Sequence, residues 1–448
     1  MTRRSVVGPL ILILLGGLFL AHNVVPELEV FKLLSTYWPF LLIAWGVLRL
    51  IEVLLTAAAS RPLPARGLSG GEVFLIILIC LVGLTSTAVS RHWPRIRLGD
   101  RGMEIFGETY DYTLSQEKAV GEKARIVFDN LRGNVRVSGG DYKGLRLTGR
   151  KTIRAFDKAD AGRTHEKTPL EITQEGDRIV VRTNQDKVAE NRNISADLEV
   201  TVPRGASIEG RGRYGDFDIN DIDGVVEITS DNAGVRLNRI GGNAKIDLGR
   251  SDIVRAVDVK GSLELNGRRT GGDIEIENVQ GPVTVTGAFG GNLEFKNLPR
   301  QFRFESRNTE LRVEKIPGRL AMNLGNLTAT NLVGPVRVTS RSKDIKIEDF
   351  TESLEVDVDR GDVEIRPKHK PLPKIAARSR SGSIELVLPE GARFELSATT
   401  ERGEARNEYG DALKVEEDGR TATIKGKTGQ GPTLSVTTSR GSVTVRKE

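Results

Sequence analysis

The chain has 448 residues, a formal net charge of +6, only 5% aromatic residues and 49 glycines. This length allows two or three domains, and the composition is typical of many short strands joined by tight turns. Lysines, arginines and acids are mixed along the chain, which argues against a nucleic-acid partner because such proteins concentrate basic residues. The single cysteine, Cys80, excludes an internal disulfide, and the four histidines lie too far apart in sequence for a metal-ligand motif.

Three apolar segments occupy the first 90 residues: Val6 to Leu20, Trp38 to Leu55 and Val73 to Val89. Each has about 15 to 18 residues, near the lower limit of the ~20 that cross a bilayer as a helix. We interpret them as three retained transmembrane helices. A cleaved signal peptide is the alternative for the first segment, although no small-x-small cleavage site follows it.

The basic residues around these segments predict an orientation. Arg3 and Arg4 precede the first segment, and Arg61 and Arg66 follow the second, so the N-terminus is expected inside and the C-terminus outside. The prediction is a multi-pass protein of the inner (cytoplasmic) membrane with an extracytoplasmic β domain. Four arginines after the third segment argue for the opposite orientation: Arg91, Arg95, Arg97 and Arg101.

The first two apolar segments share features with a known helix pair. A Gly16-Gly17 pair lies inside the first segment, and Trp38-Pro39 opens the second. This arrangement resembles the helix pair of Lia-type membrane proteins of the cell-envelope stress response. The resemblance covers only about fifty residues, and it implies a location at the cell envelope.

Beyond a predicted connector at residues 91–118, a repeating apolar pattern begins. It places apolar residues at offsets 0, 2, 5, 9 and 11, often with glycine at offset 7, and it recurs every 16 to 20 residues. An internal period of this length indicates stacked units. The copies begin at Ile126 and then at Phe217, Val235, Val254, Ile274, Leu293, Leu311, Leu327, Ile345 and Val363.

The offsets specify two short strands in each unit. Offsets 0 and 2 face one side of a strand, offsets 9 and 11 do the same for a second strand, and offset 5 is expected to point inward from a turn. Glycine at offset 7 is expected either to adopt a positive φ or to let the backbone approach its neighbour. Stacking the units with parallel strands ~4.8 Å apart would bury these side chains.

The predicted fold is therefore all-β. Residues 119–448 are expected to form a parallel β-helix or β-solenoid with an irregular C-terminal cap, preceded by the three-helix transmembrane region at residues 1–90. An antiparallel array is the alternative, but most repeats lack the Asn-Gly or Asp-Gly turns of tight hairpins.

Outward residues of stacked units would form ladders of mixed charge. Glu227 with Lys245, and Glu294 with Arg312, are expected to attract each other between neighbouring units. We interpret these ladders as solvated faces.

Several short motifs occur in a fixed order. They are Gly133-Asn134-Val135-Arg136-Val137, Leu198-Glu199-Val200-Thr201-Val202-Pro203, Gly215-Asp216-Phe217-Asp218-Ile219, Gly272-Asp273-Ile274, Leu388-Pro389-Glu390-Gly391 and Thr437-Thr438-Ser439-Arg440-Gly441-Ser442-Val443. Together they resemble the bacterial β-strand-repeat family known as domain of unknown function 4097, which is also labelled adhesin-like. The resemblance covers about 330 residues and implies the fold, while the family defines no function.

Both resemblances favour a membrane-anchored, non-enzymatic interaction module of the cell envelope: a scaffold, an adhesin-like protein or an envelope-stress regulator. The expected partners are the lipid bilayer and an unidentified protein or envelope polymer, with self-association as a further option. No nucleic acid and no cofactor are expected. A self-assembling structural rod is one alternative.

The other alternative is a polysaccharide-active enzyme, which would need clustered carboxylates. We assign no catalytic, cofactor-binding or metal-binding residue, because the candidate carboxylates have no histidine or tyrosine beside them in the sequence. These candidates are Asp216, Asp218, Asp221, Asp357, Asp359 and Asp362.

Overall fold

The computed structural model describes residues 107–189 and 193–448, together with Arg97–Gly99, Gly102–Glu104 and scattered residues between positions 39 and 84. The chain forms two compact units, Met1–Gly107 and Glu108–Glu448. In the first unit the described residues between 39 and 84 are helical. Further along, β1 (Arg97–Gly99) pairs antiparallel with β2 (Gly102–Glu104).

The prediction of three transmembrane helices is contradicted. Among the described residues, no helix is both long enough and apolar enough to cross a membrane. Apolar segments of about 15 to 18 residues fall short of the ~20 that a spanning helix needs. The segment from Val6 to Leu20 lies outside the described residues, as do parts of the other two. The predicted multi-pass inner-membrane localisation is contradicted by the same finding.

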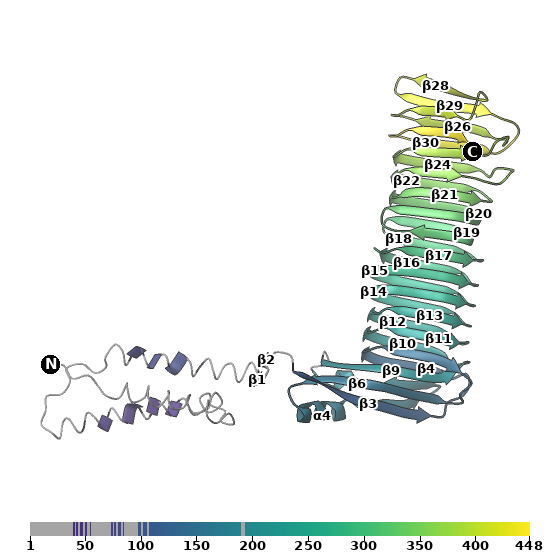
Figure 1. The fold of residues 1–448 in the computed structure, drawn as a ribbon. Coiled ribbons are helices and arrows are strands. Elements are labelled where there is room, and N and C mark those ends of the chain that lie inside the picture. Colours follow the sequence, from purple (N-terminus) through teal and green to yellow (C-terminus); the bar gives the residue numbers. More distant parts are fainter. Residues whose placement is uncertain are drawn as a thin grey trace, which may run out of the picture. The chain divides into compact units, whose positions relative to one another are not determined.

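The second unit is a rod of stacked β coils (Figure 1), and within residues 108–189 and 193–448 its strands form one sheet of 29 strands. Successive coils pair in parallel along most of the rod. Ile219, for example, lies opposite Val137 of one neighbouring coil and Leu237 of the other. The predicted β-solenoid is therefore confirmed.

One end of the rod is closed by antiparallel strands. β3 (Glu108–Lys118) and β9 (Ile194–Pro203) pair with the two sides of β6 (Leu145–Ala155). The helix α4 (Lys158–Lys167) begins after Asp157, whose carboxylate accepts the Asp160 N–H at 2.7 Å and caps the helix. The other elements here are β4 (Arg125–Arg132), β5 (Val135–Gly140), β7 (Glu171–Glu175), β8 (Arg178–Arg182) and the 3₁₀ helix η1 (Gln185–Lys187).

Each regular coil contributes a strand to two columns that run along the rod. The first column contains the strands with offsets 9 and 11, and the second column contains those with offsets 0 and 2. Two long strands, β14 (Ala244–Val259) and β15 (Leu263–Val279), contribute to both columns. The first column also includes β10 (Ser207–Tyr214), β12 (Val226–Asn232), β16 (Val283–Phe289) and β18 (Phe302–Ser306), and the second includes β11 (Phe217–Ile222), β13 (Val235–Ile240) and β17 (Leu293–Leu298).

A left-handed residue explains why offset 5 points inward. Side chains alternate along a strand, so a residue three positions after offset 2 would otherwise face solvent. The residue at offset 4 has a positive φ, which restores the inward direction at offset 5, and Ile222, Ile240 and Val259 there are fully buried. Asp and Asn tolerate this conformation best. At offset 4, the residues with a positive φ, between 49° and 59°, are Asp221, Arg239, Asp258, Asn278, Asn297, Asn331 and Asp349.

The glycines at offset 7 serve close approach between coils. A Cβ on Gly224 would lie 2.3 Å from the Ala206 carbonyl oxygen, and one on Gly242 would lie 2.4 Å from the Gly224 carbonyl oxygen. Neither glycine has a positive φ. Gly224 and Gly242 therefore show the close approach predicted for offset 7, while Gly133 and Gly334, at offset 7 of other copies, show the predicted positive φ, 119° and 87°.

One coil runs backward. β19 (Thr309–Met322) pairs antiparallel with β17, with β18 and with β20 (Asn326–Ser342). The reversal follows a tight turn in which the Ser306 hydroxyl accepts the Thr309 N–H at 3.1 Å. The repeat that begins at Leu311 therefore lies in the opposite direction, with Leu311 opposite Phe304 in the first column.

The predicted attraction between Glu294 and Arg312 is consequently wrong. Glu294 lies opposite Ala321 and forms an ion pair with Arg319. Read backward, the offsets 0, 2, 5, 9 and 11 become 0, 2, 6, 9 and 11, so the apolar pattern is nearly the same in both directions. Hydrophobic periodicity alone could not reveal the reversal.

A crosslink tests the direction of β19. In a Cys80→Ser background, Glu294→Cys with Ala321→Cys should form a disulfide, because directly opposite antiparallel residues have Cα atoms about 4.5 to 5.5 Å apart. Glu294→Cys with Arg312→Cys should stay reduced. Non-reducing electrophoresis after mild oxidation distinguishes them, and crosslinking of the second pair alone would contradict the reversed coil.

The far end of the rod is built out of sequence order. The pairing there runs β24, β30, β26, β29 and β28, so strands late in the chain lie between earlier ones (Figure 1). The outermost strand, β28, exposes Lys414, Glu416, Glu417 and Asp418, charges that discourage pairing with another edge. The strands are β21 (Asp344–Phe350), β22 (Leu354–Arg360), β23 (Val363–Arg366), β24 (Ile375–Ser381), β25 (Ile384–Leu388), β26 (Glu395–Thr400), β27 (Ala405–Glu408), β28 (Leu413–Asp418), β29 (Thr421–Lys427), β30 (Thr433–Thr438) and β31 (Val443–Lys447).

Candidate functional site

A groove of about 630 Å³ opens beside the reversed coil. It forms where the register between β19 and β20 shifts on both sides of Lys315, so the regular pairing of the two strands is interrupted there. Four cationic and two acidic side chains lie among its walls. The lining residues are Arg300, Gln301, Arg312, Val313, Glu314, Lys315, Pro335, Val336, Arg337, Ser353 and Glu355.

A row of three arginines crosses the reversed coil. Arg303, Arg312 and Arg337 lie directly opposite one another on β18, β19 and β20. Like charges at adjacent strand positions repel, so each needs an acidic partner. The ion pairs are Arg303–Glu305 at 2.6 Å, Arg312–Glu310 at 2.7 Å and Arg337–Glu355 at 2.8 Å.

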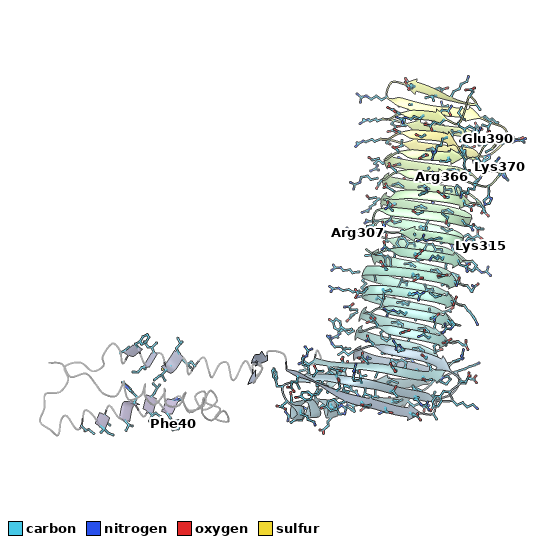
Figure 2. The ribbon with its side chains drawn as sticks, viewed as in Figure 1. Phe40, Arg307, Lys315, Arg366, Lys370 and Glu390 are labelled. Atoms are coloured by element: carbon cyan, nitrogen blue, oxygen red, sulfur yellow. The ribbon has the colours of Figure 1, made fainter. Side chains whose placement is uncertain are left out.

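Two other cations of the groove have no such partner. Within the described residues, the side chains of Arg300 and Lys315 make no hydrogen bond or ion pair. Arg300 is exposed and Lys315 is half-buried, and Figure 2 shows Lys315 at one edge of the rod. Glu314, also exposed, is the groove's remaining carboxylate apart from Glu355. An acidic group from another molecule could therefore bind here without displacing an internal ion pair.

The first set of candidate carboxylates belongs to ladders between coils. Asp216 accepts the Gly234 N–H at 2.8 Å and pairs with Arg236 at 3.0 Å. Both oxygens of Asp221 accept hydrogen bonds from Arg239, at 2.7 and 2.8 Å, and these bonds lower the pKa of Asp221. Asp218 lies 3.3 Å from Arg136 and accepts a hydrogen bond from Asn220. These carboxylates connect coils rather than converge on a shared site.

The second set of candidate carboxylates also faces residues of neighbouring coils. Asp362 accepts the Ser383 N–H at 2.7 Å, and Asp359 lies 3.8 Å from Arg380. Asp357 is opposite Arg378 in the register of β22 and β24. In the part of the chain that the structure describes, no three His, Cys, Asp or Glu side chains are placed to share one metal ion.

The sequence model of the Toastrack domain, DUF4097, matches residues 126–446. The chain belongs to the Toastrack family. The match confirms the family resemblance that the strand motifs indicated. The resemblance to a Lia-type helix pair concerns residues before this match, most of which lie outside the described part. No curated protein matches the chain.

Three solved structures are similar to the Toastrack rod. A candidate cell adhesion protein from Clostridium sporogenes is 8% identical, with 76% of this chain and 100% of that chain covered and a TM-score of 0.16. A candidate adhesin from Bacteroides fragilis is 10% identical, with 75% and 97% covered and a TM-score of 0.28. A candidate lipid-binding protein from Parabacteroides distasonis is 12% identical, with 76% and 98% covered and a TM-score of 0.25.

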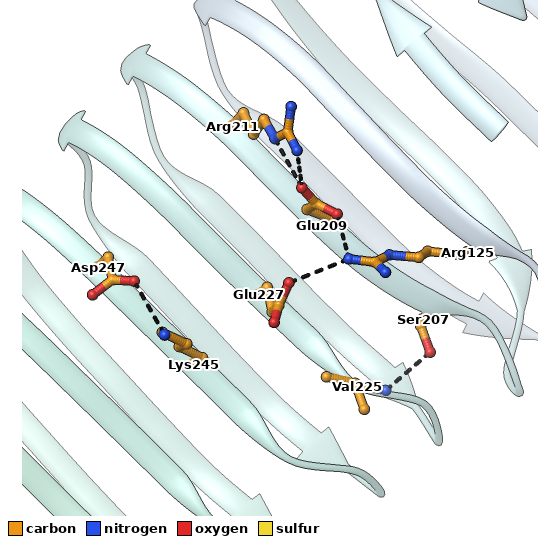
Figure 3. A network of polar contacts seen from close by, with 8 residues as sticks. All are labelled: Arg125, Ser207, Glu209, Arg211, Val225, Glu227, Lys245 and Asp247. Carbon is orange, nitrogen blue, oxygen red and sulfur yellow. Dashed lines mark hydrogen bonds and ion pairs between the residues drawn. The ribbon is translucent and has the colours of Figure 1, made fainter. Parts of the chain in front are cut away.

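Near the base of the Toastrack rod, a polar network ties three coils together (Figure 3). Glu209 lies between Arg125, at 2.8 Å, and Arg211. Burial opposes ionisation of Glu209, but hydrogen bonds from Arg211 and Arg125 outweigh it and lower its pKa. Arg125 also lies 3.5 Å from Glu227.

The predicted pair of Glu227 and Lys245 is partly realised in this network. The two residues are directly opposite in register. Lys245 nevertheless reaches toward Asp247 on its own strand, at 4.0 Å, and Glu227 toward Arg125 (Figure 3). The predicted register is therefore present, but each of the two charged side chains forms its ion pair with another neighbour.

Sequence reasoning missed a buried lysine. Lys151 is fully buried in the Toastrack rod, where its ammonium group donates to the carbonyl and hydroxyl oxygens of Thr168. Burial lowers the pKa of Lys151 to about 8. Nearby, His165 stacks on Tyr112 with ring centroids 4.1 Å apart. The alternation of β6 contained the signal, because Lys151 shares the inward phase of Leu147 and Ile153.

Proposed function

We propose that this chain is a non-enzymatic interaction module of the cell envelope, in which the Toastrack rod presents a binding surface. The observation that carries the proposal is the groove beside the reversed coil, where Arg300 and Lys315 have no partner among the described residues. A row of arginines adjoins them. This arrangement favours a partner with exposed acidic groups, such as a protein surface or an envelope polymer. Scaffold, adhesin-like and regulatory roles all require such contact.

The charge ladders support binding over catalysis. A general acid must remain protonated near neutral pH, which requires a raised carboxyl pKa. Hydrogen bonds from arginine lower the pKa of Asp221 and Glu355, while at Glu209 they outweigh the opposing effect of burial. These groups therefore remain carboxylates that hold neighbouring coils together.

Reversing the groove's charge tests the proposal. The full chain should sediment with washed cell-envelope material, and Arg300→Glu with Lys315→Glu should weaken this binding by roughly tenfold, equivalent to about 1.4 kcal/mol. The measurement is cosedimentation over a range of protein concentrations at fixed salt.

The matched control is Lys414→Glu with Arg420→Glu, which makes the same change in charge at exposed positions on and after β28. Its binding should equal that of the parent chain. Equal weakening by both variants would reduce the effect to net charge and contradict a specific groove. Release of soluble fragments from the envelope material would contradict the non-enzymatic assignment.

A further inference from the structure

A row of arginines follows one edge of the rod, at the turn between the first and second columns. Hydrogen bonds between neighbouring turns make the row continuous: the Arg341 N–H donates to Asn308, the Lys343 N–H to Arg360 and the Gly382 N–H to Arg440. Figure 2 shows Arg307 at this edge. We call these six residues the arginine edge: Arg307, Arg341, Arg360, Arg380, Arg440 and Arg402.

The arginine edge is exposed and mostly unpaired. All six residues are exposed, and within the described residues only Arg380 has an ion-pair partner, Asp359 at 3.8 Å. The other five guanidinium groups make no hydrogen bond or ion pair inside the described chain. They are thus available to a molecule outside the protein.

Most acids near the arginine edge are engaged elsewhere. Asp344 accepts the Asp362 N–H at 2.9 Å, and Asp362 in turn accepts the Ser383 N–H at 2.7 Å. Glu404 forms an ion pair with Arg406. Glu401, which is exposed, remains as an acid beside the row. The edge therefore keeps a local excess of positive charge, although the whole chain is close to balanced.

The geometry of the turns does not require arginine. Arg360, Arg402 and Arg440 each precede a glycine, and the side chains extend into solvent. Neighbouring coils lie about 4.8 Å apart, and the register places Arg360 opposite Ser342 and Ser381, so the arginines are staggered along the edge. A planar guanidinium can bind a carboxylate or phosphate through two parallel hydrogen bonds, which a lysine cannot do.

We propose that the arginine edge binds a linear anionic glycan of the envelope, with one carboxylate on successive sugar units. The spacing of the coils is close to the length of one sugar residue, so successive carboxylates can meet successive guanidinium groups. The six turns contain no aromatic side chain on which a base could stack, which disfavours a single-stranded nucleic acid. This inference rests on the proposed envelope-binding function and names a ligand class and a second surface for it.

The test uses the full chain and defined polymers. Oligogalacturonides should bind, with an affinity that rises with length and levels off at about six sugars, the number of arginines on the edge. The triple variant Arg341→Gln, Arg360→Gln, Arg440→Gln should bind at least roughly tenfold more weakly and show a smaller salt dependence. The corresponding lysine variant should recover only part of the affinity, because it restores charge without the planar fork.

Three controls decide between outcomes. A control triple variant removes the same positive charge at exposed positions near the base of the rod: Lys123→Gln, Arg154→Gln and Lys158→Gln. It should bind oligogalacturonides as tightly as the parent chain does. Neutral dextran should not bind. Equal losses in both triple variants, or tighter binding of single-stranded DNA or inorganic polyphosphate than of the glycan, would overturn the inference. Circular dichroism confirms that each variant is folded.

The two proposals fail in different ways. Binding to washed envelope material without binding to any anionic glycan would overturn the arginine-edge inference and leave the interaction module intact. A chain that binds neither would overturn both.

Discussion

Replacing Gly441 by alanine should lower the free energy of unfolding by about 3 kcal/mol or more, because it combines backbone strain with a clash between coils. Gly441 has a φ of 137°, and a Cβ there would lie 2.2 Å from the Gly382 carbonyl oxygen. A Cβ on Gly382 would likewise lie 2.0 Å from the Gly361 carbonyl oxygen. The stacked glycines let three turns approach closely, and one methyl group would push them apart.

Gly410 provides a control with nearly identical backbone geometry. Its φ is 136°, yet no atom lies within 4 Å of the Cβ that alanine would add. Gly410→Ala should therefore show only the strain of a positive φ, about 1 kcal/mol. Urea unfolding followed by circular dichroism measures both variants. Equal destabilisation would mean that the close approach of the coils contributes nothing.

Raising the pH from about 8 to about 10.5 should stabilise the fold through Lys151. The folded state favours neutral Lys151, whose pKa is lowered to about 8, whereas the unfolded chain keeps the ordinary value of 10.5. Between these values the unfolded state binds more protons, so stability rises with pH. The difference corresponds to about 3 kcal/mol, at about 1.36 kcal/mol for each pKa unit.

Lys151→Met should remove the part of this rise in unfolding free energy that comes from Lys151, whatever its effect on stability at neutral pH. A smaller rise from Lys343, whose pKa burial also lowers, should remain. Lys427→Met, which removes an exposed lysine of β29, should leave the rise in place. The measurement is the free energy of unfolding at several pH values from 7 to 11, taken for all three proteins. A curve for Lys151→Met that still parallels the parent would show that another group titrates.

The apolar pattern predicted burial well because burial follows directly from strand alternation. Phe217, Ile219 and Ile222 all lie in the core, as their offsets indicate. The direction of the coil at Leu311 could not be predicted, since the offsets read almost equally well backward. The reversed strand follows a polar turn, Ser306 to Thr309, whose hydroxyl hydrogen bonds a pattern of apolar residues does not record.

The candidate surfaces were harder to predict than the fold. The groove depends on a register shift at Lys315, which arises from the antiparallel pairing of β19 with β20. The arginine edge needs the stacking order β24, β30, β26, which places Arg440 between Arg380 and Arg402. In sequence these residues are separated by the hairpin of β28 and β29, so no window along the chain contains them together.

That stacking order has a consequence for biosynthesis. β26 to β29 are synthesised before β30 and β31, yet β26 pairs with β30 and β27 with β31. While the ribosome is still adding residues 433–447, β26 and β27 lack the coil of β30 and β31 with which they pair. Assembly of this end of the rod must therefore wait for strands that emerge later, and until then the growing chain presents an open sheet edge to chaperones or to neighbouring chains.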